Sequence, residues 1–278
     1  MTEFSEITYT NQELLIAFAL TLIAGLSTGI GSTIAFFAKR TSTMFLSIAL
    51  GFSAGVMIYI SFVEIFFEAK EILTIELGPS MGHFYTVTAF FVGMLFIALI
   101  DKAVPAFENP HEPKLVEEIT NADEQKKRSK LLRMGVLSAF AIAIHNFPEG
   151  LVTFFAALKD IKLGLPIAIA IAIHNIPEGI AISVPIYHAT GSKKKAFKYS
   201  FLSGLAEPIG ALVGFLILMP FLNNFIFGIV FAFVAGIMVF ISLDHLLPAA
   251  REYGKPHLAL YGLIGGMAVM AASLIILG

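Results

Sequence analysis

The chain consists of long apolar stretches separated by short polar segments, and this pattern predicts membrane-spanning helices. A helix needs roughly 20 mainly apolar residues to cross the hydrocarbon core. The stretches do not alternate with polar residues, so they predict helices rather than barrel strands. Eight segments qualify, at about residues 14–38, 44–69, 84–104, 133–158, 162–188, 197–219, 225–248 and 257–277. We therefore predict an all-α polytopic membrane protein, with residues 1–278 forming one transmembrane domain.

Composition supports this prediction and limits the possible chemistry. Hydrophobic residues make up 57% of the chain, charged residues 14%, and the mean hydropathy is +0.85. A soluble domain has about 25% charged residues. Cysteine is absent, which excludes disulfides and thiolate metal sites. The acidic, polar N-terminus lacks the basic region of a signal peptide, so the first apolar run is expected to remain as a membrane helix. No basic patch suggests nucleic-acid binding.

The charges in the connecting segments predict the orientation in the membrane. Of the 18 basic residues, 15 fall in the first, third, fifth and seventh predicted loops. Because basic loops remain in the cytoplasm, both termini are expected outside a bacterial inner (plasma) membrane. The one long loop, residues 105–132, is rich in Pro, Glu and Lys, and we expect a flexible cytoplasmic connection that is partly helical near 114–130.

A ten-residue motif occurs twice. Residues 141–150 read AIAIHNFPEG and residues 170–179 read AIAIHNIPEG, so that only Phe147 and Ile176 differ. The copies lie on consecutive predicted helices, which must cross the membrane in opposite directions. Two copies on antiparallel helices are related by a pseudo-two-fold axis in the membrane plane, which is the inverted repeat found in many transporters.

The motif carries side chains suited to metal binding. On a helix, His145 and Glu149 lie on one face, with Asn146 beside Glu149. The second copy repeats this arrangement with His174, Asn175 and Glu178. Imidazole nitrogen and carboxylate oxygen together suit Zn²⁺, Fe²⁺, Mn²⁺, Co²⁺ or Cd²⁺. The proline within each motif also frees a backbone carbonyl one turn earlier, which offers a further acceptor.

The charge balance in these segments also indicates a cation. A third acid, Glu207, lies in the sequence GLAEP of the sixth segment. Three unpaired carboxylates at mid-membrane, Glu149, Glu178 and Glu207, would cost on the order of 10 kcal/mol on insertion scales. No Lys or Arg occurs in residues 134–158, 163–192 or 199–250. Compensation must therefore come from metal, bound protons or water.

Other polar residues in apolar segments carry less weight. Glu64 is equally consistent with a pathway residue and with a structural role. Glu68, Asp244 and His245 lie near predicted segment ends, where charged side chains reach the interface, so we expect structural roles for them. His111 is expected to be a solvated loop residue.

The motifs HNFPEG, HNIPEG and SGLAEP, together with AGIMVFISLDHLLP and ATGSKKKAF, resemble the ZIP (Zrt-, Irt-like) family of metal transporters, in particular its bacterial ZupT branch. The resemblance extends over nearly the whole chain. It implies the ZIP fold, with eight helices, inverted-repeat symmetry and both termini outside. It also implies uptake of zinc, iron, manganese, cobalt or cadmium ions into the cytoplasm, as transported substrates rather than cofactors.

The resemblance further implies two neighbouring metal sites between the fourth and fifth helices. One, of a zinc type, would use His145, Glu149, His174 and Glu178. The other, of an iron type, would use Asn146, Glu149, Asn175, Glu178 and Glu207. Glu149 and Glu178 would bridge the two sites. Many eukaryotic relatives have a His-rich loop after the third helix, whereas this chain has only His111 there.

Two other functions remain as alternatives. An intramembrane metallohydrolase would need a separate general base, as in H-E-x-x-H, and that motif is absent. A metal sensor or scaffold would bind metal without transporting it. On balance the sequence predicts a transporter and not an enzyme. Gly262, Gly265 and Gly266 form a candidate surface for a homodimer.

Overall fold

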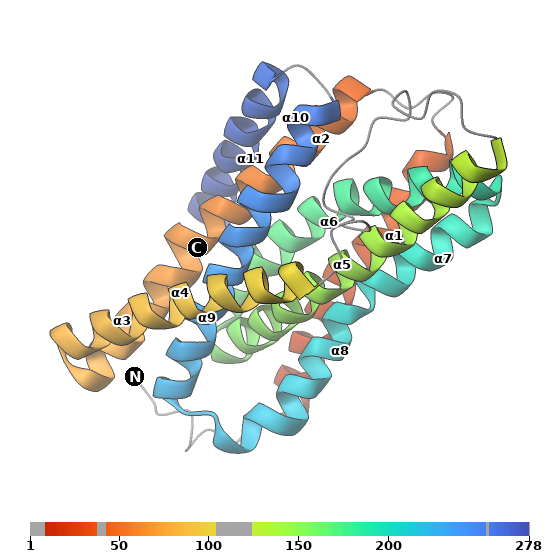
Figure 1. Ribbon diagram of the computed structural model, residues 1–278. Coiled ribbons are helices and arrows are strands. Elements are labelled where there is room, and N and C mark those ends of the chain that lie inside the picture. The colour runs from red at the N-terminus through yellow and green to blue at the C-terminus, as the bar shows by residue number, and fades with distance from the viewer. Residues whose placement is uncertain (1–8, 38–42, 104–123, 254–255, 278) are drawn as a thin grey trace.

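The structure is a computed structural model that describes residues 9–37, 43–103, 124–253 and 256–277. All regular elements in these ranges are helical (Figure 1). In chain order they are α1 (Asn11–Phe37), α2 (Thr43–Ile60), η2 (Ser61–Ile65), α3 (Phe66–Leu77), α4 (Pro79–Ala103), α5 (Glu124–Lys159), α6 (Ile161–Thr190), α7 (Lys193–Gly204), α8 (Ala206–Val213), η5 (Gly214–Leu218), η6 (Met219–Phe221), α9 (Asn224–Ile241), η7 (Ser242–Leu246), α10 (Leu247–Tyr253) and α11 (Pro256–Leu277).

The predicted fold class is confirmed. Within the described ranges, seven helical stretches are long and apolar enough to cross a membrane. Helix α5, which is 36 residues long and carries the first motif, is a further long helix there. Several predicted segments are runs of helix continued through a π-helical turn, as at η2, η5 and η7. Helix α5 begins at Glu124, inside the predicted loop 105–132 and within residues 114–130, where partial helix was expected. Residues 104–123, including His111, lie outside the described residues.

The helices form two groups on largely opposite sides of the view in Figure 1. Helices α1, α5, α6, α7 and α8 pack mainly on one another, and we call them the motif bundle because they hold both motifs. Helices α2, α3, α4, α9, α10 and α11 form the second group, the framework bundle. The two bundles meet where α2 and α11 contact α6 and where α9 contacts α5.

Glycine allows close packing inside the framework bundle. Gly51 and Gly55 of α2 face Gly262 and Gly266 of α11, and a Cβ added to any of these four would overlap a carbonyl oxygen of the opposite helix. This small-xxx-small spacing lets membrane helices approach closely. Two of the three glycines proposed as a dimer surface are therefore used within the chain, whereas Gly265 has no atom near its missing Cβ.

The close glycine contacts lie within the bundles. In the described residues, every glycine whose added Cβ would overlap the backbone of another helix faces a helix of its own bundle. Examples in the motif bundle are Gly31, Gly150 and Gly179. Each bundle is thus closely packed at its helix crossings. Between the bundles, Ser53 Oγ of α2 donates to the His174 carbonyl of α6 at 3.4 Å. Buried hydrophobic side chains of the two bundles nevertheless form one continuous core cluster.

Candidate metal centre

The two motifs face each other across a helical hairpin. Helix α5 ends at Lys159 and α6 starts at Ile161, so that only Asp160 separates them. The Asp160 carboxylate caps α6 by accepting the backbone N–H of Lys162 at 2.9 Å. Such a short connection forces the helices to run antiparallel. The six polar motif side chains lie well inside the helices and are buried, the most exposed being His145 at 3%.

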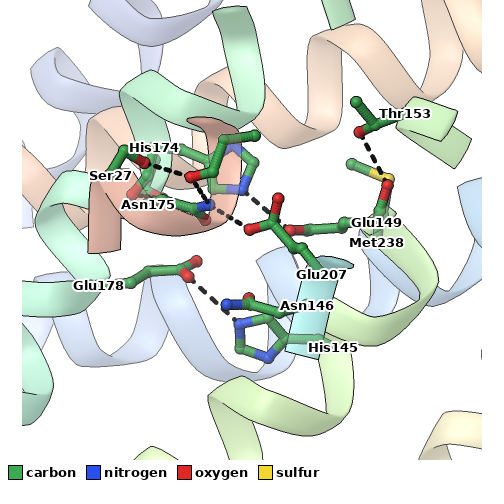
Figure 2. A network of polar contacts seen from close by, with 12 residues as sticks. Ser27, His145, Asn146, Glu149, Thr153, His174, Asn175, Glu178, Glu207 and Met238 are labelled. Carbon is green, nitrogen blue, oxygen red and sulfur yellow. Dashed lines mark hydrogen bonds and ion pairs between the residues drawn. The ribbon is translucent and has the colours of Figure 1, made fainter. Parts of the chain in front are cut away.

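Each motif pairs its histidine with the glutamate of the other motif (Figure 2). His145 Nε2 lies 3.4 Å from Glu178 Oε2, and His174 Nε2 lies 3.3 Å from Glu149 Oε2. The exchange is the geometry that an inverted repeat predicts, because the two-fold axis interchanges α5 and α6. All four groups therefore converge from opposite helices on one region.

The two asparagines connect this region to the third acid. Asn175 Nδ2 donates to Glu207 Oε1 and to the Ala24 carbonyl, the latter at 2.9 Å. Asn146 Nδ2 donates to the Ser203 carbonyl at 3.3 Å. Glu207 lies in the first turn of α8, after the short break at Leu205, and it is fully buried. The sixth segment therefore supplies a carboxylate to the same region, as the sequence suggested.

Several buried oxygens of this cluster have no hydrogen-bond partner. One side-chain oxygen is unpartnered in each of Asn146, Glu149, Asn175, Glu178 and Glu207. Leaving a buried acceptor unsatisfied costs about 1–3 kcal/mol, and more for a charged group. These atoms are acceptors that a cation would satisfy, and the surrounding helices contain no Lys or Arg between residues 134 and 158 or 163 and 192. The donor set fits a divalent metal.

The side chains nevertheless form two pairs rather than a closed shell. In the part of the chain that the structure describes, the one group of three His, Asp or Glu side chains with all ligand atoms within 4.8 Å of one another is Asp101, Asp244 and His245. His245 Nε2 lies 3.4 Å from both acids. To bind one cation between the motifs, the His–Glu pairs must exchange their contacts for metal.

The polar residues for which the sequence predicted structural or undecided roles lie outside this cluster. Asp244 and His245 lie in the π-helical turn η7 and meet Asp101 at the end of α4. Sequence reasoning missed Asp101, because the partners are far apart along the chain. Glu64 lies half-buried in the π-helical turn η2, and such turns are frequent at functional sites. Glu68 forms an ion pair with Lys159.

Comparisons with known proteins identify the family of the chain. The family model of the ZIP zinc transporters matches residues 102–274, more than half of the chain. The chain belongs to the ZIP family. Zinc transporter ZupT of Lysinibacillus sphaericus is 65% identical over 263 residues, covering 95% of this chain and 98% of that protein. The proteins of the same name from Oceanobacillus iheyensis and Streptococcus mutans are 63% and 62% identical, with 95% and 96% of this chain covered and 98% and 99% of theirs.

Family membership decides between a transporter and an enzyme. The matching proteins are transporters, so this ZIP protein is a multi-pass membrane protein and not an enzyme. The metallohydrolase alternative is therefore dropped. The family assignment leaves open which side chains bind the metal, and the geometry described above is the basis for choosing them.

Proposed function

We propose that this protein carries zinc and related divalent cations across the membrane through the buried cluster between α5, α6 and α8. The observation that carries the proposal is the set of unpartnered buried oxygens that converge from three helices beside two histidines, with no basic side chain between residues 134 and 158 or 163 and 192. The proposed ligands are His145, Asn146, Glu149, His174, Asn175, Glu178 and Glu207. The names of the relatives point to the same substrate.

The cluster offers two donor sets that differ in chemical hardness. His145, Glu149, His174 and Glu178 combine imidazole with carboxylate, which suits Zn²⁺ and Cd²⁺. The second set combines Glu149 and Glu178 with Asn146, Asn175 and Glu207 instead of the histidines. Its ligand atoms are all oxygens, which favour harder ions such as Mn²⁺ and Fe²⁺. Glu149 and Glu178 belong to both sets. We therefore propose adjoining positions for iron, manganese, cobalt and cadmium as well as zinc, with the two glutamates shared.

The test is uptake by purified protein in vesicles. Vesicles that contain the purified protein are expected to take up external Zn²⁺ down its gradient. External Fe²⁺, Mn²⁺, Co²⁺ or Cd²⁺ should compete with this uptake. The loop charges predict that both termini lie outside an inner membrane, and the ZIP resemblance implies transport into the cytoplasm. Tight metal binding without any flux would instead identify a sensor.

We further propose that transport proceeds by alternating access, with the motif bundle moving against the framework bundle. All seven proposed ligands belong to the motif bundle. The half of α5 beyond the motif is sealed, because every residue from Val152 to Leu158 is buried. This is the end predicted to face outside, and its burial supports a proposed state that is closed on that side. At the same end, Lys159 of α5 pairs with Glu68 of α3 and lies 5.1 Å from the Phe227 ring centroid of α9.

Cross-linking this end is expected to stop zinc uptake. The chain has no cysteine, so Glu68→Cys with Lys159→Cys can be joined by a bifunctional thiol reagent without side reactions at native cysteines. The link ties the two bundles together and should hold the outer side closed. Uptake is measured before linking, after linking, and after cleavage of a reducible linker, which should restore it.

The matched control is the pair Glu76→Cys and Asn224→Cys. Asn224 Nδ2 at the start of α9 donates to Glu76 Oε2 of α3 at 3.4 Å, so this pair lies within the framework bundle. Linking them should leave uptake unchanged. If the 68–159 link forms completely and transport continues at the unlinked rate, the bundles do not separate at this end.

A further inference from the structure

The pseudo-two-fold axis of the motif bundle also relates α1 to the run formed by α7 and α8. Gly25 of α1 and Gly204 of α7 meet at the crossing of these helices, and a Cβ added to either would overlap the carbonyl oxygen of the other. A crossing in which each residue contacts its counterpart in the same way is the mark of a two-fold relation. Gly25 and Gly204 are therefore equivalent positions.

Packing against the motif helices follows the same register. A Cβ on Gly179 would overlap the carbonyl oxygen of Thr28, and a Cβ on Gly150 would overlap that of Glu207. Gly150 and Gly179 are the matching glycines of the two motifs. Thr28 and Glu207 each lie three residues after the crossing glycine of their own helix. The contacts thus place Thr28 where the second half of the molecule has Glu207.

Two further contacts repeat this correspondence. Gly31 would overlap the carbonyl of Ile176 and Gly210 that of Phe147, at matching positions of the two motifs. The asparagine donors obey the same register, because Asn175 bonds the Ala24 carbonyl of α1 and Asn146 bonds the Ser203 carbonyl of α7. The sequences agree as well, since residues 24–31 read AGLSTGIG and residues 203–210 read SGLAEPIG.

The Thr28 hydroxyl is unusual among the threonines of α1. Thr21 and Thr33 donate to the carbonyl four residues earlier, at 2.9 and 3.0 Å. The carbonyl that Thr28 would use belongs to Ala24, and it already accepts Asn175 Nδ2 at 2.9 Å and Ser27 Oγ at 2.6 Å. Thr28 Oγ1 is consequently buried without a partner. Buried hydroxyls in proteins nearly always have a partner, so this oxygen is available to an ion in the cluster.

We propose that Thr28 is a specificity-determining residue of the metal site, occupying the place that pseudo-symmetry assigns to a second Glu207. Glu207 accepts from Asn175, so Thr28 is the counterpart on the Asn146 side, where Asn146 Oδ1 is also unpartnered. A hydroxyl there supplies a neutral oxygen. The site then holds three carboxylates rather than four, which lowers its preference for hard cations and eases release. This inference rests on the proposed transport function.

Exchanging the two residues tests the equivalence. Glu207→Thr alone is expected to reduce zinc uptake about tenfold or more, as for loss of a metal ligand or its partner. Adding Thr28→Glu to that variant returns a carboxylate at the equivalent position, and uptake should recover most of the loss. A folded double variant with no recovery would overturn the equivalence. If Glu207→Thr itself transports normally, the proposed site fails and not only this inference.

A milder substitution tests the hydroxyl. Thr28→Val keeps the shape and removes the oxygen, so the Mn²⁺ concentration that halves zinc uptake should rise about three- to tenfold, as for a lost hydrogen-bonding partner. Calorimetric Mn²⁺ binding to the solubilised protein should weaken equally. The control is Ser32→Ala, another unpartnered buried hydroxyl of α1, whose counterpart in this register is the apolar Ala211. Identical Mn²⁺ behaviour of the two variants would contradict a role for Thr28.

Discussion

Replacing Glu149 or Glu178 by glutamine is expected to reduce zinc uptake about 100-fold or more. Changing only an outer partner of a metal ligand costs about 10–100-fold, and these glutamates are the two carboxylates shared by both proposed donor sets. Each has one oxygen against the histidine of the other motif and a second oxygen without a partner. Glutamine keeps the size but loses the charge and converts one acceptor into a donor.

The initial rate of radioactive zinc uptake into vesicles with equal amounts of folded protein measures this effect. Glu76→Gln is the control, because Glu76 is an exposed carboxylate at the end of α3. The pseudo-symmetry adds a second requirement, since Glu149 and Glu178 occupy equivalent positions. The two variants should therefore be impaired to a similar degree, and a Glu149→Gln or Glu178→Gln protein that transports normally would remove that residue from the site.

The membrane helices could be predicted from the sequence because each one depends only on its own run of apolar residues. Each span must satisfy its own backbone within the bilayer, so an apolar run of sufficient length is nearly enough to identify it. The exact start of α5 was less accessible, since Glu124 to Arg133 is polar and the sequence predicted only partial helix near residues 114–130. The π-helical turns at Glu64 and Asp244 were also missed, because an added residue in a helical turn has no fixed sequence pattern.

The candidate site was accessible for a different reason. A ten-residue motif repeated on adjacent helices indicates both the types of metal-binding side chain and the pseudo-two-fold relation between them. Contacts between distant segments carry no such repeat. Asp101 meets His245, and Lys159 meets Glu68, only through the packing of whole helices. The match between residues 24–31 and 203–210 could have been seen in the sequence, but its register becomes convincing only when the glycine contacts fix it.

Substituting Gly179 by alanine is expected to destabilise the protein and to abolish transport. A Cβ at this position would overlap the Thr28 carbonyl oxygen and lie 3.2 Å from Ser200 Oγ. Ser200 Oγ itself donates to the Thr28 carbonyl at 3.1 Å. Overpacking of a core costs about 1–3 kcal/mol, and the cost here should reach the upper end because backbone rather than a flexible side chain must move. Gly150→Ala should behave alike, since its Cβ would overlap the Glu207 carbonyl.

Gly265→Ala is the matched control, because no atom lies within 4 Å of its added Cβ. Alanine in place of glycine inside a helix is favourable by about 0.5–1 kcal/mol, so this variant should keep its activity and melt at the same or a higher temperature. Thermal unfolding in detergent, followed by fluorescence-detected size exclusion, measures the change in melting temperature. This change should be negative for Gly179→Ala and zero or positive for Gly265→Ala. Comparing the two variants separates the effect of alanine on helix propensity from the effect of a Cβ that prevents two helices from packing closely. A Gly179→Ala protein as stable as the Gly265→Ala protein would mean that α1 and α6 are not in direct backbone contact, and with that contact would go the register that equates Thr28 with Glu207.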